Sequence, residues 1–412
     1  MNSQILFNLI IGIIIISFVL DKILDAINAR HFNDPIPAEL DDVYDQTEYE
    51  KSQNYKKERF KFGLISSTFS ILLTLGFIFL DGFEFVDDIA RSYSENNIVI
   101  ALIFFGIIML VSDLIMLPFS YYSTFVIEEK YGFNKTTMKT FIFDKLKGLL
   151  MMAFIGGGIL ALIVWFYELA GENFWWYAWI LVSVFSIFMN MFYAKLIVPL
   201  FNKQTPLEDG SLRNKIEAYA RKVGFKLDNI FVIDGSKRST KANAYFSGFG
   251  KEKRITLYDT LINDLEEEEI VAVLAHEVGH YKKNHIIINL IVSILTTGFT
   301  LWLLSLFVGN PILSKALGVE TPSFHIGLVA FGILYGPISE ITSLIMNYLS
   351  RKFEYQADDF ASSTYNGNAL ISSLKKLSKN SLSNLTPHKA YVFWHYSHPS
   401  LLQRTRNLKS GL

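Results

Sequence analysis

The segment His276-Glu277-Val278-Gly279-His280 has the residue types and the spacing of a metal-dependent hydrolase. On an α-helix, His276 and His280 lie four residues apart and project from one face. Two imidazoles in that arrangement can hold a zinc ion, and Glu277 can hold a water against it as a general base. The pattern arises by chance in roughly one chain in a hundred of this length, so its surroundings decide its meaning.

Both flanks of the motif favour a helix at a membrane surface. The preceding run Leu265–Glu269 is acidic, which suits a helix N-terminus because negative charge is stabilised there. The following segment Ile286–Val308 is apolar and long enough to cross a bilayer. The sequence therefore predicts that the motif lies on a helix that runs into a membrane.

A catalytic zinc site needs a third protein ligand and leaves its fourth position to water. The chain has no Cys, so histidines and carboxylates must supply the ligands. Glu354 is the predicted third ligand because it follows the last apolar segment, on the same membrane side as His276. One helical turn further on, Asp358 could orient a ligand imidazole through its free N–H, with Asp359 as the alternative.

Composition points to a membrane protein. Of 412 residues, 51% are hydrophobic and 35 are Phe, which is too apolar for a soluble chain of this length. The net charge of −1 gives no basic field for nucleic acid, so no nucleic-acid partner is expected. The absence of Cys also excludes thiolate metal sites and prenylation of this chain itself.

Seven apolar stretches reach spanning length, and lipid is therefore an expected partner. They are Ile5–Leu24, Phe62–Phe83, Ile98–Tyr121, Leu149–Leu169, Trp175–Leu200, Ile286–Val308 and Phe324–Leu349. Lys and Arg alternate between the connections: Asp21–Lys61 is rich in them, whereas Glu84–Asn97 carries only Arg91. The positive-inside rule then places the N-terminus outside, with Phe201–His285 and the tail in the cytoplasm.

The predicted fold is an all-α polytopic membrane protein. We expect seven transmembrane helices and a small cytoplasmic α+β portion that carries the His-Glu-x-x-His motif. The expected division is 1–200 (five helices), 201–285 (catalytic segment), 286–349 (helices six and seven) and 350–412 (tail with the third ligand). Within the catalytic segment we expect a turn-rich stretch (Asn202–Gly210), a helix (Leu212–Val223), three strands (Asn229–Asp234, Asn243–Phe249, Arg254–Asp259) and a hairpin turn at Gly250–Lys253.

Two carboxylates fall inside predicted spans. Glu340 recurs with Asn347 and Glu354 at intervals of seven residues, so the three share a helix face. Intramembrane carboxylates face protein or water, which indicates a wet interior for this face and for Asp113. The alternative, that Glu340 and Asp113 pair with Lys or Arg inside the bundle, remains equally open. His398 is a loop histidine, and spacing alone favours a structural role for it.

Several motifs together resemble the type I CAAX prenyl proteases, a family of integral-membrane zinc metalloproteases. The resemblance is spread along most of the chain and is highly specific. It comprises Phe125–Lys135, Pro199–Lys203 with Thr205-Pro206-Leu207, Asn243-Ala244-Tyr245-Phe246, Asn347 with Ser350-Arg351, Glu354 and Ala357-Asp358, and Ser397-His398-Pro399 with Arg404.

The resemblance implies roles for these residues. His276, His280 and Glu354 would bind about one zinc ion per chain, with Glu277 as the general base. Asn243 and Ala244 would lie on an edge strand that pairs with an extended substrate. It further implies that His398 approaches the site as a substrate or oxyanion contact, that Asn347 and Arg404 bind substrate, and that Arg351 supports the ligands with Asp358. The resemblance also implies that the seven transmembrane helices surround an interior chamber, with the zinc-protease portion at its cytoplasmic end. One departure is visible, since Ser239-Thr240-Lys241-Ala242 stands where the family commonly has a His.

The predicted function is a zinc endopeptidase that cleaves the C-terminal tripeptide of prenylated CAAX-type proteins, with its site open to the cytoplasm. The membrane would be the plasma membrane in a bacterium and the endoplasmic reticulum in a eukaryote. An alternative enzyme is a quality-control or processing protease without a prenyl requirement. A transporter or channel would give His276 no role, and no inverted repeat supports one. The intact ligand set argues against an inactive scaffold.

Overall fold

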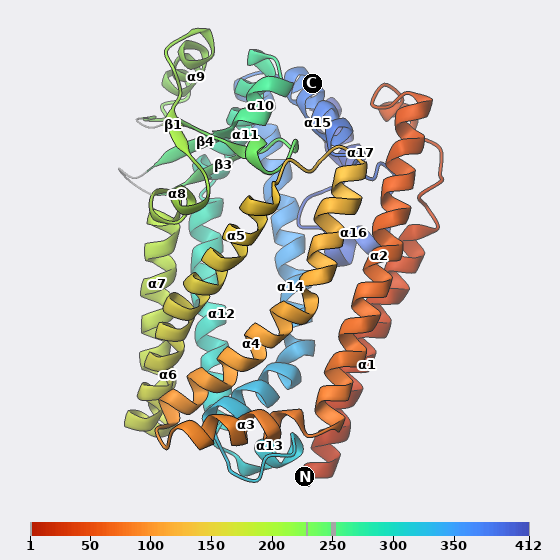
Figure 1. The fold of residues 1–412 in the computed structure, drawn as a ribbon. Coiled ribbons are helices and arrows are strands. Elements are labelled where there is room, and N and C mark those ends of the chain that lie inside the picture. Colours follow the sequence, from red (N-terminus) through yellow and green to blue (C-terminus); the bar gives the residue numbers. More distant parts are fainter. Residues whose placement is uncertain (1, 228–229, 249–252, 412) are drawn as a thin grey trace.

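The structure, a computed structural model, describes residues 2–227, 230–248 and 253–411. Most of each predicted apolar segment lies in a long helix of the bundle (Figure 1). These helices are α1 (Ser3–Ala29), α2 (Gln46–Phe79), α4 (Asn97–Tyr122), α5 (Met138–Met151) continued by α6 (Gly157–Ala170), α7 (Phe174–Leu196), α12 (His285–Phe307) and α14 (Phe324–Thr364).

Six helical stretches in the described chain are long and apolar enough to cross a membrane, and one of them is the 64-residue stretch Met138–Phe201. This stretch contains two predicted spans, because a 3₁₀ turn at Gly171–Asn173 separates α6 from α7. The two helices pack against each other. The multi-pass helical bundle that the sequence predicts is therefore confirmed.

The two ends of the bundle differ. Two short helices, α3 (Gly82–Tyr93) and α13 (Pro311–Ala316), lie at the end that holds the N-terminus (Figure 1). Their apolar side chains form a buried cluster with Leu6, Ile10 and Phe104. The sheet, α11 and the C-terminus lie at the opposite end. The connections that the charge pattern assigns to opposite sides therefore lie at opposite ends of the bundle.

Two residues with a left-handed backbone end helices earlier than the apolar pattern predicts. Asp81 (φ 52°) turns the chain into the amphipathic α3, so the predicted span up to Phe83 is wrong at its end. Asn284 (φ 59°) separates α11 (Glu267–Lys282) from α12. The motif helix therefore does not run continuously into the membrane, because the chain bends at Asn284.

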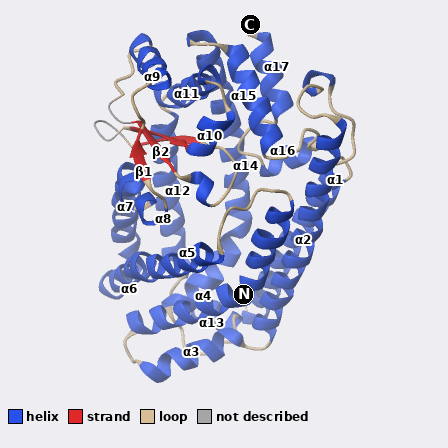
Figure 2. Ribbon diagram, turned by 45° about the horizontal axis from the view of Figure 1, so that its top comes forward, coloured by secondary structure: helices blue, strands red, loops and turns tan. Residues whose placement is uncertain are grey.

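A four-stranded sheet lies at the end of the bundle that holds α11 and the C-terminus (Figure 2). Its strands are β1 (Gln204–Pro206), β2 (Ile230–Ile233), β3 (Ala244–Ser247) and β4 (Arg254–Tyr258), in the order β1-β2-β4-β3. β2 runs parallel to β4, whereas β3 pairs antiparallel with β4 and forms an edge of the sheet. The sequence did not predict β1, which lies in the stretch interpreted as turns. Residues 250–252 of the expected hairpin turn lie outside the described residues.

The sheet and the motif helix share one core. Val271, Leu274 and Val278 of α11 are buried with Leu257 of β4 and Ala361 of α14. Four further short helices complete this end: α9 (Ser211–Lys222), α10 (Asp259–Asp264), α15 (Gly367–Asn380) and α17 (Leu401–Ser410). α8 (Val198–Phe201) and α16 (Lys389–His395) connect it to the bundle. The helix over residues 211–222 confirms the predicted one.

The intramembrane carboxylates have different surroundings. Asp113 forms an ion pair with Lys145 (Nζ to Oδ1, 2.7 Å), as the pairing alternative predicts. Glu340 is exposed on α14. α14 itself continues without a break through residue 349, where the predicted division between the last spans and the tail falls. A single interior chamber stays a prediction.

Candidate active site

Local sequence explains why the motif helix begins where it does. Glu266 is the N-cap of α11, and the Glu269 carboxylate accepts a hydrogen bond from the Glu266 amide (2.9 Å). Three acidic residues in the first turn stabilise the positive end of the helix dipole. The buried apolar face then fixes the rotation of the helix, so that His276 and His280 face Glu354 of α14.

Gly279 lets α11 and α14 approach closely. A Cβ at this position would lie 3.0 Å from the Ala357 Cα and 3.1 Å from its carbonyl oxygen. Because both of those atoms are backbone, a larger residue would push the helices apart. The glycine inside the motif therefore sets the distance between the two histidines and Glu354.

The side chains of His276, His280 and Glu354 converge, with one ligand atom of each within 4.8 Å of the others. The two Nε2 atoms lie 3.1 Å apart, and Glu354 carboxylate oxygens lie 3.4 Å from that of His276 and 3.2 Å from that of His280. Ligands of a tetrahedral zinc ion, each about 2.0–2.1 Å from it, are about 3.3 Å apart. Glu354 Oε2 is also buried without a hydrogen bond among the described residues. The donor set therefore fits such an ion.

Asp358 and Arg404 contact the second ring nitrogen of His276, Nδ1, and so hold its imidazole. Its Nδ1 lies 2.9 Å from Asp358 Oδ1, as predicted for the residue that orients a ligand imidazole. Arg404 binds both Asp358 oxygens (2.5 and 2.9 Å), and its Nη1 lies 3.4 Å from Glu354 Oε2. Only 11% of the Arg404 side chain is exposed, and its predicted contact with substrate stays a prediction.

The support of His280 was not predicted from the sequence. His280 Nδ1 lies 3.0 Å from His285 Nδ1, and His285 Nε2 lies 2.8 Å from Gln356 Oε1. His285 is buried and stacks on Phe353, with ring centroids 4.1 Å apart. In a continuous helix, a residue five positions after His280 would point elsewhere, whereas the bend at Asn284 brings His285 back to it. The only sequence signal was a third histidine close to the motif.

Two further groups face the ligands. Glu277 is one residue past His276 and so lies about 100° around the helix. Burial raises the pKa of its carboxyl, and the neighbouring His276 and His280 act in the opposite direction. A raised pKa suits a general base that must accept a proton near neutral pH. His398 Nε2 lies 3.3 Å from Glu354 Oε1, and 64% of its side chain is exposed, so this residue reaches the site as the resemblance implied.

Of the remaining predicted site residues, two lie at the edge strand β3 and two contact the C-terminal tail. Ala244 begins β3, the edge strand, and Asn243 directly precedes it. Asn347 Nδ2 instead donates to the Trp394 carbonyl (2.8 Å). Arg351 Nη1 donates to carbonyl oxygens of the α16 end, at 3.3, 3.4 and 2.5 Å. The contacts of these two residues hold the tail segment that presents His398, and their predicted roles at the substrate and the ligands stay predictions.

Lys241, at the place where the family commonly has a His, joins the catalytic segment to the bundle. Its Nζ lies 2.8 Å from Glu128 Oε2 and donates to the Tyr55 hydroxyl (3.3 Å). The Phe133 ring lies 4.3 Å from the same ammonium. The departure therefore replaces a histidine with a cation that binds the loop before β3 to α2.

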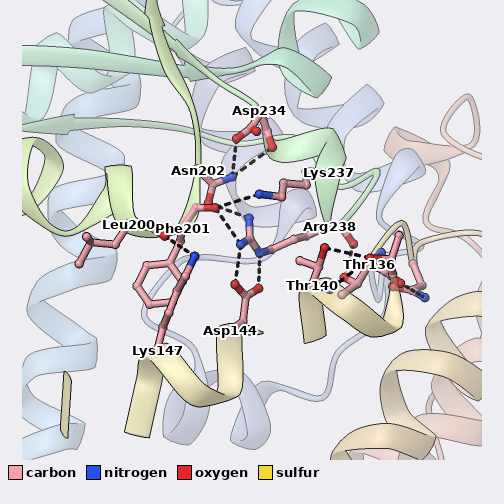
Figure 3. Close-up of polar contacts among 12 residues, drawn as sticks. Thr136, Thr140, Asp144, Lys147, Leu200, Phe201, Asn202, Asp234, Lys237 and Arg238 are labelled. Atoms are coloured by element: carbon pink, nitrogen blue, oxygen red, sulfur yellow. Dashed lines mark hydrogen bonds and ion pairs between the residues drawn. The ribbon is translucent and has the colours of Figure 1, made fainter. Parts of the chain in front are cut away.

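A second set of contacts anchors the same loop. We call Asp144, Asn202, Asp234 and Arg238 the Arg238 network (Figure 3). The Arg238 guanidinium binds both Asp144 oxygens of α5 (2.7 and 2.8 Å) and donates to Asn202 Oδ1 (3.0 Å). Asn202 Nδ2 in turn donates to Asp234 Oδ1 (2.8 Å). The network fixes the sheet against the membrane helices.

Taken together, the helical bundle and the buried His-His-Glu cluster define a multi-pass membrane metalloprotease of the His-Glu-x-x-His type. Residues 206–411 match the model of peptidase family M48, and residues 25–203 match that of the CAAX prenyl protease N-terminal region with five membrane helices. The chain belongs to peptidase family M48.

Proteins similar over nearly their whole length support this assignment. CAAX prenyl protease 1 of Saccharomyces cerevisiae is 38% identical, covering 90% of this chain and 87% of that protein. The human CAAX prenyl protease 1 homolog is 34% identical, covering 91% and 89%. The crystal structure of S. mikatae Ste24p superposes with a TM-score of 0.93 at 35% identity, covering 99% of both chains.

Proposed function

We propose that this chain is a zinc endopeptidase that removes the C-terminal tripeptide of prenylated CAAX-type proteins. The observation that carries the chemistry is the convergence of His276, His280 and Glu354 at separations of 3.1–3.4 Å. The substrate class rests on the names of the similar proteins, which are CAAX prenyl protease 1 and its homologs. About one zinc ion per chain is expected.

Each side chain at the site has a task in this reaction. His276, His280 and Glu354 would hold the zinc ion, which would supply Lewis-acid chemistry at the scissile carbonyl and at the attacking water. Glu277 takes a proton from that water and passes it to the leaving amine. Asp358 and His285 hold the ligand imidazoles so that both present Nε2. His398 can donate to the substrate oxygen on which negative charge develops.

Arg404 is proposed to be a positioning residue. It holds Asp358 with two hydrogen bonds, and Asp358 holds His276. Its positive charge also lies close to Glu354, which favours the ionised, metal-binding form of that carboxylate. This role accounts for its burial, which a direct substrate contact would not require.

The edge strand offers a place for the peptide. β3 pairs with β4 on one side, so its other side can accept an extended substrate by strand addition. A cavity of about 900 Å³ lies there, lined by Asn243 and Tyr245 of the strand region, Tyr193 of α7 and Asn289 of α12. This volume falls within the range of ligand sites, ~300–1,000 Å³.

The site is proposed to face the cytoplasm, since the positively charged connections lie at its end of the bundle. The chain has no Cys, so one can be introduced at the exposed Asp209 without interference. A membrane-impermeant thiol reagent should label it only after the membrane is opened. Labelling from outside intact cells would reverse the orientation.

The substrate class is tested with two peptides that differ only in the prenyl group on the Cys. Purified protein should cleave the prenylated peptide after that Cys, lose activity with a chelator and regain it with zinc. Mass spectrometry identifies the bond. Equal cleavage of both peptides would favour the alternative of a general membrane protease, and cleavage that survives complete metal removal would exclude the zinc mechanism.

A further inference from the structure

A cavity of about 740 Å³ lies between α2 and the C-terminal tail. Its apolar lining includes Phe32, Phe60 and Leu382, and its volume is in the range of small-ligand sites, ~300–1,000 Å³. His398 also lines it, and the Nε2 of His398 lies 3.3 Å from Glu354 Oε1. The cavity therefore adjoins the candidate metal site.

Lys56 of α2 lines this cavity and forms no ion pair with any of the described residues. The residue is 8% exposed, and its Nζ makes no hydrogen bond among the described residues. The Tyr49 ring lies 5.8 Å from the ammonium. Lysines are almost never buried unless they are paired, because an isolated buried charge is costly. This part of the cavity is therefore suited to an anion.

The other polar groups of the lining are consistent with an anion. The Asn384 side chain is held by its Oδ1, which accepts from the Thr386 amide (3.1 Å), while its Nδ2 is buried without a partner among the described residues. Arg59 lines the cavity as well, but its charge is offset by Glu128 at 3.8 Å. Asp25, the acidic residue of the lining, is neutralised by Lys22 at 2.5 Å. The lining thus carries unpaired donors and a net positive charge.

The cavity is connected to the loop before the edge strand through Tyr55. Tyr55 lines it, and the Tyr55 hydroxyl accepts from Lys241, two residues before Asn243. A peptide that paired antiparallel with β3 would run from the Ser247 end of the strand toward Asn243. Its C-terminal end would then be directed toward this cavity.

We propose that the cavity binds the free C-terminal carboxylate of the substrate, with Lys56 as its counter-ion and Asn384 as a second donor. The inference rests on the proposed endopeptidase function and deepens it, since the enzyme would recognise the chain end as well as the bond. The Lys56 ammonium sits on a flexible four-carbon stem, so a change of rotamer can bring it to a carboxylate that enters the cavity.

The test uses two prenylated peptides that differ only in a C-terminal acid or amide. The full-length, zinc-loaded protein should cleave the acid with a kcat/KM about 10- to 100-fold higher, mainly through KM, because a hydrogen bond to a charged group is lost in the amide. Lys56→Gln should lower kcat/KM for the acid to that for the amide and leave the amide unchanged. Lys56→Arg should restore part of the preference, and the exposed Lys51→Gln on the same helix should match wild type.

Several outcomes would overturn the inference. Equal cleavage of acid and amide by wild type would do so, even if Lys56→Gln fails to fold. An equal loss on both peptides in a folded Lys56→Gln protein would show a structural role. In phosphatidylcholine vesicles, inhibition by added phosphatidylglycerol in wild type but not in Lys56→Gln would identify a lipid phosphate as the occupant. Cleavage of neither peptide by wild type would reject the proposed function itself.

Discussion

Two networks of charged side chains lie at the catalytic end of the molecule, and they differ in how far their polar atoms are hydrogen-bonded. In the Arg238 network, both Asp144 oxygens accept from Arg238, and Asn202 both donates and accepts. We call His276, His280 and Glu354 the ligand cluster. In this cluster, the Nε2 atoms of the two histidines lie 3.1 Å apart, and a buried oxygen of Glu354 has no hydrogen bond among the described residues. The first network is hydrogen-bonded within itself, whereas the second has the donor atoms and spacing of a possible metal site.

This difference suggests that one network stabilises the fold and the other binds metal. A fully hydrogen-bonded network stabilises one arrangement of the elements that it joins. A buried set of converging acceptors is costly unless something binds it. Changes in the ligand cluster should therefore alter metal content and turnover, whereas changes in the Arg238 network should alter stability.

The largest effect is expected from Glu354→Ala. Loss of a residue that only orients a ligand costs metal affinity about 10- to 100-fold, so loss of a ligand should cost more than ~100-fold and reduce turnover to background. Zinc per chain, measured by mass spectrometry after dialysis, checks the first effect and peptide cleavage the second. A variant that keeps a stoichiometric, tightly held zinc ion would remove Glu354 from the ligand set.

Glu277→Gln should separate catalysis from metal binding. The amide keeps the shape of the side chain but cannot accept the proton, so turnover should fall by about 10²- to 10⁴-fold while zinc stays bound. Peptide affinity, measured by competition, should be unchanged. Wild-type turnover in a zinc-loaded Glu277→Gln protein would contradict the proposed general base.

Asp358→Asn tests the support of His276. The amide can still accept a hydrogen bond from Nδ1 but loses the charge that raises ligand basicity, and its pairing with Arg404 weakens. Zinc affinity should fall about 10- to 100-fold, as measured by competition with a chelator of known affinity. Asp359→Asn, on the adjacent residue, is the control. If the two variants bind zinc equally well, the orienting role belongs to neither carboxylate.

The smallest effect on metal is expected from the Arg238 network. Asp144→Asn leaves the Arg238 guanidinium without its ionic partner, and because both side chains are about a quarter exposed (25% and 24%), we expect a loss of about 1–3 kcal/mol in stability. Thermal unfolding in detergent should show a lower midpoint with unchanged zinc content. Asp209→Asn, in an exposed pair with Arg213, should change little. Zinc loss in a folded Asp144→Asn protein would contradict the claim that the Arg238 network affects stability but not metal binding.

The spans and the motif could be predicted because they depend on local pattern. Apolar runs such as Ile98–Tyr121 match the helix α4 to within a residue at each end, since only a helix satisfies its backbone in lipid. The acidic run before the motif likewise located the start of α11. The predictions were least accurate where backbone conformation overrides composition, as at Asp81 and Asn284.

The supporting residues could not be predicted because they depend on tertiary contacts. His285 reaches His280 only through the bend at Asn284. Arg404 and Arg351 both belong to motifs of the resemblance. Arg404 contacts Asp358, whereas Arg351 holds the tail, and no spacing along the chain distinguishes the two residues. Lys56 attracts notice only once its burial is known.

X-ray absorption at the zinc edge of the reconstituted protein tests the central claim most directly, because it reports the atoms around the metal. We expect about one zinc ion per chain with two imidazole nitrogens and carboxylate or water oxygens at roughly 2.0–2.2 Å in a four-coordinate shell. Glu354→Ala should change or abolish this spectrum, whereas Asp144→Asn should leave it unchanged. A shell with no imidazole, or the same spectrum after Glu354→Ala, would show that the ligand cluster is not the metal site.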